Sequence, residues 1–316
     1  MVRSLVRFLG IALGWVLLAA AATAIWLHYH SARGTTAIYV TAGVPLMLVV
    51  AVAAVVLFLL FRRWMALCLA VAALIGLGYT QAPLWVSQNV SAGERFTVVS
   101  ANLMVGSGDI DALAAQVESV DASLVSLQEV TPAALERIRA STLVRRLPYQ
   151  YVITGDAAGG TMLLSTSPLA DQQRIPNSLL NNLSARTALP GASSTTVLGV
   201  HIAAPLTGYA DDWNRELAGL RERLAALPAG PVVVAGDFNA TWDHAQYRAL
   251  LDDGFADAAA QAGAGFVPTY PTDRFGGRPL AAIDHVIVRG FTSANFYTFD
   301  LEGSDHRGVV VSLVAS

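Results

Sequence analysis

The first ninety residues constrain the fold of this chain more than any other feature, because they contain no Asp, Glu or Lys. Within them lie three apolar runs, each close to or longer than the about 20 residues that cross a bilayer core of about 30 Å. The runs extend over residues 5–27, 36–61 and 64–85. We therefore expect residues 1–90 to be a membrane anchor of three transmembrane helices, followed by a separate catalytic domain in residues 91–316.

The basic residues predict how these spans are oriented. Arg3 and Arg7 precede the first span, Arg62 and Arg63 link the second to the third, and only Arg33 lies between the first two. Because cytoplasmic loops carry the excess of basic residues, the amino terminus and the Arg62-Arg63 link are expected in the cytoplasm. The prediction is a multi-pass protein of a bacterial plasma membrane with its large domain outside the cytoplasm.

The first span has an alternative interpretation as a cleaved signal peptide, since residues 19–24 are rich in the small residues that a signal peptidase accepts. Its apolar run is longer than the about 7–15 residues of a usual signal core. Cleavage would leave the other two spans and the outward domain unchanged.

Charge and cysteine content limit what residues 91–316 can bind. All 23 acidic residues but only 15 of the 20 Arg lie there, which gives this part a formal charge near −8. Binding to a phosphate backbone is driven largely by Lys and Arg, so tight nonspecific affinity for nucleic acid is not expected, although a nuclease is not excluded. The single cysteine, Cys68, allows no intramolecular disulfide. No feature points to a protein partner.

From Glu94 onward, short apolar runs alternate with amphipathic helical patterns, which predicts a mixed α/β domain. We expect helices near residues 110–120, 133–140, 212–227 and 244–251. Strands are expected at residues 97–103, 123–127, 149–154, 161–165, 185–189, 195–202, 232–235, 282–288 and 309–314.

Candidate chemical groups stand where these predicted strands end. Asn102 and Glu129 each follow a strand, although an Asn there is often only a turn former and an acid before a helix can serve its dipole. Asp237 and Asn239 follow the buried run 231–235 and, two residues apart, can face one metal or phosphate. His201 ends another strand, where a structural histidine is the competing interpretation.

Two Asp-His dipeptides follow, Asp284-His285 and Asp305-His306. Hydrolysis requires a carboxylate on a hard cation, an imidazole that takes a proton from water, and a second carboxylate that fixes the imidazole tautomer. Asp305, His306 and Asp284 fit these roles in that order. Each dipeptide alone is weak support, whereas the set is much stronger.

The ordered set of these residues over about residues 95–316 resembles the endonuclease/exonuclease/phosphatase superfamily, in its membrane-anchored bacterial type. The resemblance implies an α/β four-layer sandwich, in which two packed β-sheets are flanked by helices. It also implies hydrolysis of a phosphoester that depends on Mg²⁺ or Mn²⁺. An all-oxygen ligand set agrees with magnesium, and the shortage of thiolate and clustered imidazole argues against zinc.

The resemblance assigns the metal site to three residues. Glu129 is similar to the principal ligand, and Asn102 and Asp305 complete or support the site.

By the same resemblance, Asp237 and Asn239 orient the water and the scissile phosphate. His306 resembles a base held by Asp284, and His201 a second histidine that contacts the phosphate or assists the leaving oxygen. Which histidine is base and which is acid stays open.

One further position and one departure complete the resemblance. Arg186 stands before a strand, as a phosphate-contacting Arg does in the deoxyribonuclease branch, with a surface Arg as the competing interpretation. The abasic-site endonucleases carry a Tyr where this chain has Asp156-Ala157-Ala158, which weakens that branch as a match.

The substrate is expected near the membrane, because the linker from about Pro83 to Glu94 is short. We rank a phospholipid or a lipid-linked sugar phosphate slightly above extracellular DNA or RNA. A non-catalytic anchored binding domain is the second alternative, opposed by the expected residue type at each site position. Transport is disfavoured because the three spans carry no Asp, Glu or Lys.

Overall fold

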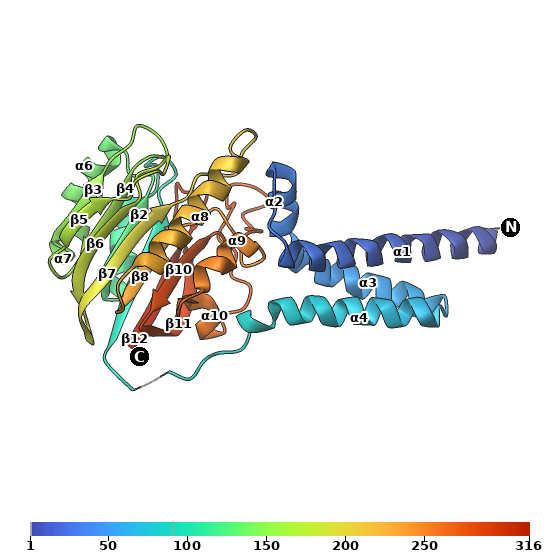
Figure 1. Cartoon of the computed structure of the whole chain (residues 1–316). Helices are drawn as coiled ribbons and strands as arrows, with labels where there is room; N and C mark the ends of the chain where they lie inside the picture. The colour runs from blue at the N-terminus through green and yellow to red at the C-terminus, as the bar shows by residue number, and fades with distance from the viewer. Residues whose placement is uncertain (1, 91) are drawn as a thin grey trace.

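The computed structural model describes residues 2–90 and 92–316, which form a helical amino-terminal part followed by an α/β part (Figure 1). The helical part extends away from one end of the α/β part, with the amino terminus at its far tip. Its elements are α1 (Val2–Tyr29), α2 (Thr35–Ala42), η1 (Val44–Leu46), α3 (Met47–Leu60), α4 (Trp64–Gln81) and η2 (Ala82–Leu84).

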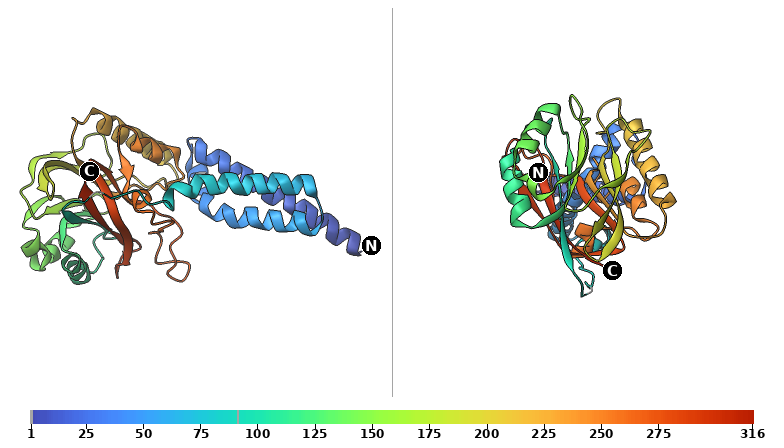
Figure 2. Two further views of the ribbon diagram at one scale, coloured as in Figure 1. Left: turned by 90° about the horizontal axis from the view of Figure 1, so that it is seen from below. Right: turned by 90° about the vertical axis from the view of Figure 1, so that its left-hand side faces the viewer.

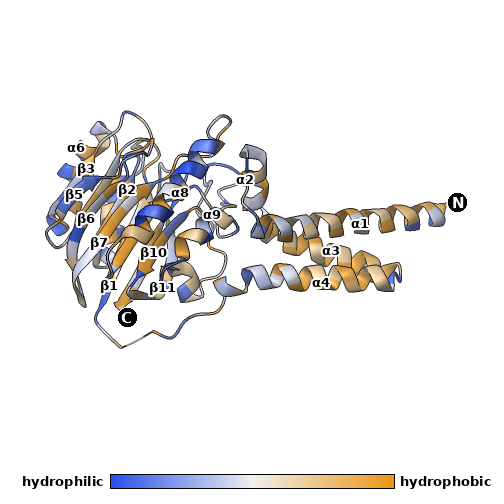
Figure 3. Cartoon of the chain, in the orientation of Figure 1, coloured by the Kyte–Doolittle hydropathy of each residue, from blue (hydrophilic) through white to orange (hydrophobic). Residues whose placement is uncertain are grey.

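Two helical stretches of the described residues, Val2–Tyr29 and Trp64–Leu84, are long and apolar enough to cross a membrane. The predicted span over residues 36–61 differs, because α2 and the segment Val44–Leu60 meet at a bend of 46°. Gly43 separates them, and Pro45 lies in the first turn of η1, where it lacks the N–H that a continuous helix would use. The three uninterrupted transmembrane helices are therefore not confirmed; a third span exists only if this bent pair counts as one. In Figure 3, which colours the ribbon by hydropathy, α1, α3 and α4 are largely in the hydrophobic colours.

The first sheet has six strands in the order β11-β12-β1-β2-β4-β3. β1 and β2 are parallel, and the other neighbouring pairs are antiparallel. The strands are β1 (Arg95–Asn102), β2 (Ala122–Gln128), β3 (Tyr149–Ile153), β4 (Thr161–Ser165), β11 (Phe291–Asp300) and β12 (Arg307–Ala315).

The second sheet also has six strands, in the order β5-β6-β7-β8-β10-β9. Here β7 and β8 are parallel, so each sheet is mixed. The strands are β5 (Ala170–Arg174), β6 (Leu183–Leu189), β7 (Ala192–His201), β8 (Val232–Asp237), β9 (Ala256–Asp257) and β10 (Asp284–Arg289).

The two sheets pack face to face through a core of aliphatic side chains, among them Val98, Leu163, Val233, Val286 and Val311. Helices cover the outer faces, with α5–α7 on one side and α8–α9 on the other (Figure 2). These helices are α5 (Ile110–Ser119), α6 (Pro132–Ala140), α7 (Leu143–Arg146), α8 (Ala210–Ala226) and α9 (Ala245–Arg248). The predicted sandwich of two packed sheets flanked by helices is confirmed.

Most predicted elements are present, with small differences at their ends. The helix expected over residues 244–251 is divided into α9 and a 3-10 turn, η3 (Ala249–Leu251). The strands β5, β9 and β11 and the helices α7 and α10 (Ala258–Ala262) had not been predicted.

Candidate functional site

Strands from both sheets end at one edge of the sandwich and carry the predicted site residues there. Asn102 and Gln128 are the last residues of β1 and β2 and are paired in register. In the other sheet, Asp237 ends β8 opposite His201 of β7 and Asp284 of β10. The polar side chains converge because two parallel pairs end side by side where the antiparallel β10 begins.

The Asp237 carboxylate lies at the centre of this cluster. Its Oδ2 atom is 3.1 Å from Asn102 Nδ2, 3.6 Å from His201 Nε2 and 3.8 Å from His306 Nε2. Its Oδ1 atom accepts a hydrogen bond of 2.8 Å from the backbone N–H of Asn239. Asp237 is only 1% exposed, so nearby charges act on it with little screening by water.

The pKa values of Asp237 and His306 in this cluster are shifted strongly. Burial raises the pKa of Asp237 to about 6, and the neighbouring Asp284 carboxylate adds to the rise against the effect of the two histidines. Burial alone lowers the pKa of His306, but the negative charges of Asp284 and Asp237 outweigh it and raise that pKa to about 10. The cluster thus holds negative charge that favours an added cation.

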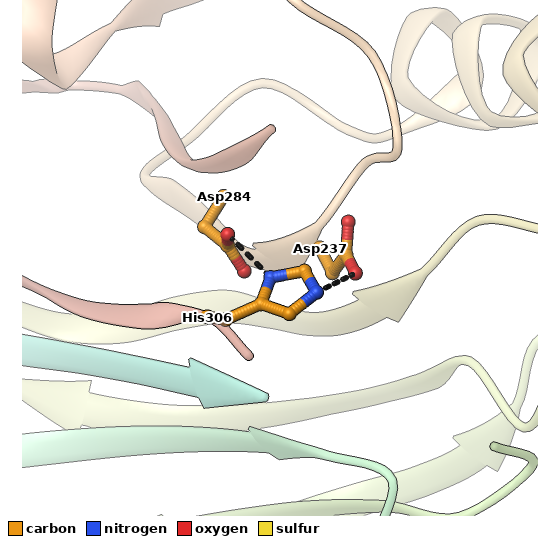
Figure 4. Close-up of side chains that lie close together, drawn as sticks. All are labelled: Asp237, Asp284 and His306. Atoms are coloured by element: carbon orange, nitrogen blue, oxygen red, sulfur yellow. Dashed lines mark hydrogen bonds and ion pairs between the residues drawn. The ribbon is translucent and has the colours of Figure 1, made fainter. Parts of the chain in front are cut away.

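A hydrogen bond of 2.9 Å joins His306 Nδ1 to Asp284 Oδ2, and His306 Nε2 points toward Asp237 (Figure 4). Asp237, Asp284 and His306 offer ligand atoms within 4.8 Å of one another, close enough to share an ion. However, the imidazole already lies between the two carboxylates and, when protonated, offsets one of their two charges. We therefore interpret this group as an oriented histidine rather than a metal centre.

The predicted ligands Glu129 and Asp305 lie on the solvent side of this group, with side chains 15% and 22% exposed. Glu129 Oε1 accepts a hydrogen bond of 3.0 Å from Asn102 Nδ2, and Asp305 Oδ1 is 4.0 Å from His306 Nε2. Burial raises the pKa of Asp305, and the charge of Glu129 contributes to this rise. The two carboxylates therefore act on each other across the site.

This donor set fits a hard divalent cation. Two partly exposed carboxylates repel each other, and a bound Mg²⁺ or Mn²⁺ would relieve that repulsion with oxygen ligands. Asn102 Oδ1 accepts a hydrogen bond of 2.9 Å from Met104 N, while its Nδ2 atom holds Glu129 and Asp237 in place. Asn102 thus connects the predicted metal ligands to the buried cluster.

The backbone around the site is strained. Four residues other than Gly adopt positive φ there: Met104 (45°), Val105 (52°), Glu129 (60°) and Asn239 (47°). Such a conformation is uncommon for any side chain and unusual for β-branched Val105. Strain of this kind persists only where the surroundings enforce it and is concentrated at functional sites.

The remaining predicted residues divide into two that reach the site and one that does not. His201 Nε2 lies 4.0 Å from Glu129 Oε1, and Asn239 Nδ2 donates to Ile202 O at 2.9 Å. Arg186 lies exposed on β6, where it donates to Ser194 Oγ at 2.6 Å and lies 3.7 Å from Asp171. Neither of these Arg186 partners belongs to the cluster.

Two site residues had no predicted role. The ring of Tyr270 packs against the His306 imidazole, with centroids 4.8 Å apart and an interplanar angle of 44°. Ser304 Oγ donates to Asn102 O at 2.7 Å and accepts from His306 N at 3.0 Å, which ties the loop before β12 to the end of β1. Ser304 stands beside the Asp305-His306 pair in sequence, whereas nothing in the local sequence distinguishes Tyr270.

Comparison with known proteins gives a consistent result. The chain is 32% identical over 139 residues to the UPF0294 protein of Vibrio parahaemolyticus, covering 44% of this chain and 46%, about half, of that relative. It is 30% identical over 203 residues to the UPF0294 protein of Vibrio cholerae, covering 61% of this chain and 68% of that protein. A humanized TDP2 of D. rerio has the same fold, with a TM-score of 0.58 at 16% identity over 69% of this chain and 98% of that one.

The sequence pattern of the Endonuclease/Exonuclease/phosphatase family matches residues 99–306, which include every residue of the cluster around Asp237. Since this match covers well over half of the chain, the protein belongs to the endonuclease/exonuclease/phosphatase family.

Proposed function

We propose that this protein is a divalent-metal-dependent phosphoesterase that hydrolyses a membrane-borne phosphoester at the outer face of the membrane. Residues 91–316 would be its catalytic domain and residues 1–90 its integral membrane anchor. The observation that carries the proposal is the buried, negatively charged cluster around Asp237, with its oriented histidine and its two partly exposed carboxylates.

In this proposal Glu129, Asp305 and Asn102 would hold Mg²⁺ or Mn²⁺, whose charge would polarise a phosphoryl oxygen and stabilise the leaving oxygen. Because Asp284 occupies His306 Nδ1, the Nε2 atom is left to hold or move a proton at the phosphate. A bound cation would also lower the high pKa of His306 by opposing the charge of the carboxylates.

Asp237 and Asn239 would orient the attacking water and the phosphate in this scheme, and His201 would contact the phosphate or assist the leaving oxygen. The support for His201 is its place between the carboxylates of Asp237 and Glu129, at 3.6 Å and 4.0 Å. Its Nδ1 atom lies 3.1 Å from Ala158 O, which leaves Nε2 directed at the site. Arg186 would reach a phosphate only on a substrate that extends beyond the cluster.

A lipid-borne phosphoester is the preferred substrate, because the domain that carries the site follows directly after apolar helices long enough to cross a membrane. An extracytoplasmic nuclease is the second candidate, favoured by the fold shared with a D. rerio TDP2 that was crystallised with a single-strand DNA product. A non-catalytic binding domain is the third candidate.

The test is turnover by the full-length protein in nanodiscs. Substrates are bis(p-nitrophenyl) phosphate, p-nitrophenyl phosphate, phospholipid vesicles and a single-stranded oligonucleotide, each with Mg²⁺ and then with a chelator. We expect hydrolysis that the chelator abolishes and that Asp237→Asn and Glu129→Gln lower at least 100-fold. Asp252→Asn, at a surface ion pair with Arg221, is the matched control.

The outcomes separate the candidates. No turnover of any substrate, with or without Mg²⁺, would favour the non-catalytic binding domain. Rapid cleavage of the oligonucleotide alone would favour the nuclease. The topology has its own test: alkaline phosphatase fused after Ser316 should be active only if the carboxyl terminus lies outside the cytoplasm, and an inactive, stably expressed fusion would reverse the orientation.

A further inference from the structure

The apolar helices and the α/β part meet in a buried polar junction. His28 Nδ1 and Gln81 Nε2, from α1 and α4, lie 2.7 Å and 2.8 Å from the same Asp243 Oδ1 atom. Trp242 Nε1 donates to Thr80 O at 3.0 Å. Asp243 is fully buried, and separating the two parts would leave it without these partners at a considerable free-energy cost. The junction therefore holds the α/β part in one orientation on the helix ends.

The short helix α2 belongs to the same junction and contacts the loop that follows His201. Ile38 is 1% exposed and packs with Trp213 of α8 in the core beneath the second sheet. His244 Nε2 lies 2.9 Å from Ile38 O, and Thr35 Oγ1 donates to Leu206 O at 3.2 Å. Leu206 is in the loop that directly follows His201. A segment from within the anchor thus borders the loop that follows a site histidine.

Tyr39 follows the buried Ile38 and is 53% exposed. The helix α2 therefore buries one side against the α/β part and leaves another side accessible.

The helix α2 and the loop that it contacts expose large apolar side chains, each between 51% and 55% accessible. They come from α2 and from the loop after His201, and comprise Tyr39, Val40, Leu206 and Tyr209. We call these four residues the apolar rim. Exposed apolar groups gathered on adjoining segments mark contact with a membrane or an apolar ligand.

We propose that α2 and the apolar rim form a wall of the substrate site, and that this wall binds the acyl part of a phospholipid in the bilayer that surrounds α1 and α4. The occupant is inferred from continuity, because α2 lies between α1 and α3 of the anchor in the chain and also contacts His244 and the loop that follows His201. This inference rests on the proposed phosphoesterase function and makes the anchor a part of the site rather than a tether.

The test uses binding rather than turnover, so that it remains informative if the enzyme is inactive. Full-length protein is placed with Mg²⁺ in phosphatidylcholine nanodiscs that contain phosphatidic acid with a photoactivatable group in its acyl chain. Cross-links are mapped by mass spectrometry. We expect labelling of residues 35–42 and 203–209 above that of α1, which bulk lipid labels in any case.

Variants sharpen the result. Tyr39→Ser and Leu206→Ser should each lower labelling of the wall, relative to α1, by about 5- to 10-fold, because each removes a large apolar contact. The matched control is Tyr79→Ser, which changes a Tyr of α4 that is 73% exposed and should change the ratio less than 2-fold. Unlabelled dioleoyl phosphatidic acid should compete for the wall, whereas glycerol 3-phosphate at equal concentration should compete at least 10-fold less.

Two results would overturn the inference: equal labelling along α1 and the wall in every variant, or displacement of the label by single-stranded DNA but not by unlabelled phosphatidic acid. Labelling of the wall without hydrolysis of any substrate would keep the inference and reject the phosphoesterase. Hydrolysis of soluble diesters without labelling of the wall would keep the phosphoesterase and reject the inference.

Discussion

His306 in the candidate site and His285 behind it occupy closely similar surroundings, yet their chemistry should differ. His306 Nδ1 lies 2.9 Å from Asp284 Oδ2, and His285 Nδ1 lies 3.0 Å from Asp257 Oδ2. All four side chains are at least nine-tenths buried. Both are therefore well-oriented Asp-His pairs in regions of little water.

Each imidazole also packs on a tyrosine ring. The His306 and Tyr270 centroids are 4.8 Å apart at 44°, and those of His285 and Tyr247 are 4.2 Å apart at 33°. The similarity of the two pairs therefore extends to the aromatic partner.

The difference is at Nε2. In His285 this atom lies 3.0 Å from Ala240 O and 3.1 Å from Ala282 O. In His306 it faces Asp237 Oδ2 at 3.8 Å and Asp305 Oδ1 at 4.0 Å, beyond hydrogen-bond distance. A histidine with both nitrogens engaged holds the fold together, whereas one with a free Nε2 can exchange a proton with a substrate.

The largest expected effect is loss of activity at His306. His306→Gln should lower phosphoester turnover by about 1,000-fold, since general acid–base catalysis contributes about 10²–10⁴. The measurement is the initial rate with Mg²⁺ on the substrate that the wild type turns over fastest. A variant with unchanged unfolding temperature and wild-type turnover would remove His306 from the reaction.

The matched change at His285 should affect stability instead. His285→Gln leaves Asp257 buried without its charged partner and should lower the free energy of unfolding by about 3 kcal/mol, while the folded fraction keeps turnover within a few-fold of the wild type. Thermal unfolding in detergent, read alongside activity per folded molecule, checks both parts. A stable but inactive H285Q protein would show that the two histidines cannot be separated in this way.

The stabilising effect of the His285–Asp257 pair should depend on pH. The Asp257 carboxylate and other groups overcome burial and hold the pKa of His285 above its ordinary value, and His285 holds that of Asp257 below its ordinary value despite burial. The carboxylate contribution is present above the unfolded Asp pKa of about 3.9 and is lost as pH falls through the lowered folded value. The imidazole contribution is present below the unfolded His pKa of about 6.5 and is lost as pH rises through the raised folded value.

The difference in unfolding temperature between the wild type and H285Q should therefore be largest between about pH 4 and pH 6.5. It should shrink on both sides of that window. A difference that grows steadily from pH 6.5 to pH 9 would contradict the assigned ion pair.

Sequence patterns predicted the strands that end at the site, because β1, β2 and β8 are buried apolar runs with a polar residue at the end. They could not predict β5, whose residues are all exposed. The bend between α2 and α3 was also missed, since hydropathy measures how apolar a stretch is and the run over residues 36–61 remains apolar through Gly43 and Pro45.

The two Asp-His pairs show a second limit. Asp284 and His285 are adjacent on β10, so their side chains point to opposite faces of the sheet, and only Asp284 reaches the site. The partners that decide their roles, Asp257 and His306, come from residues 20 or more positions away in the chain. The Asp284-His285 dipeptide indicated that an Asp-His pair forms here. Which pair forms, and what each residue does, depends on tertiary contacts.

The smallest expected effects are at the two tyrosines, where the same substitution should act differently. Tyr247 Oη donates to Asp257 Oδ2, so Tyr247→Phe removes a hydrogen bond to a charged group and should cost about 1.5 kcal/mol of stability with turnover unchanged. Tyr270 contributes its ring to His306, so Tyr270→Phe should leave turnover within about 2-fold, whereas Tyr270→Ala should lower it by about 3- to 10-fold. Unfolding temperature and turnover of all three variants check this, and a Tyr270→Phe protein as slow as Tyr270→Ala would assign the hydroxyl, rather than the ring, to the reaction.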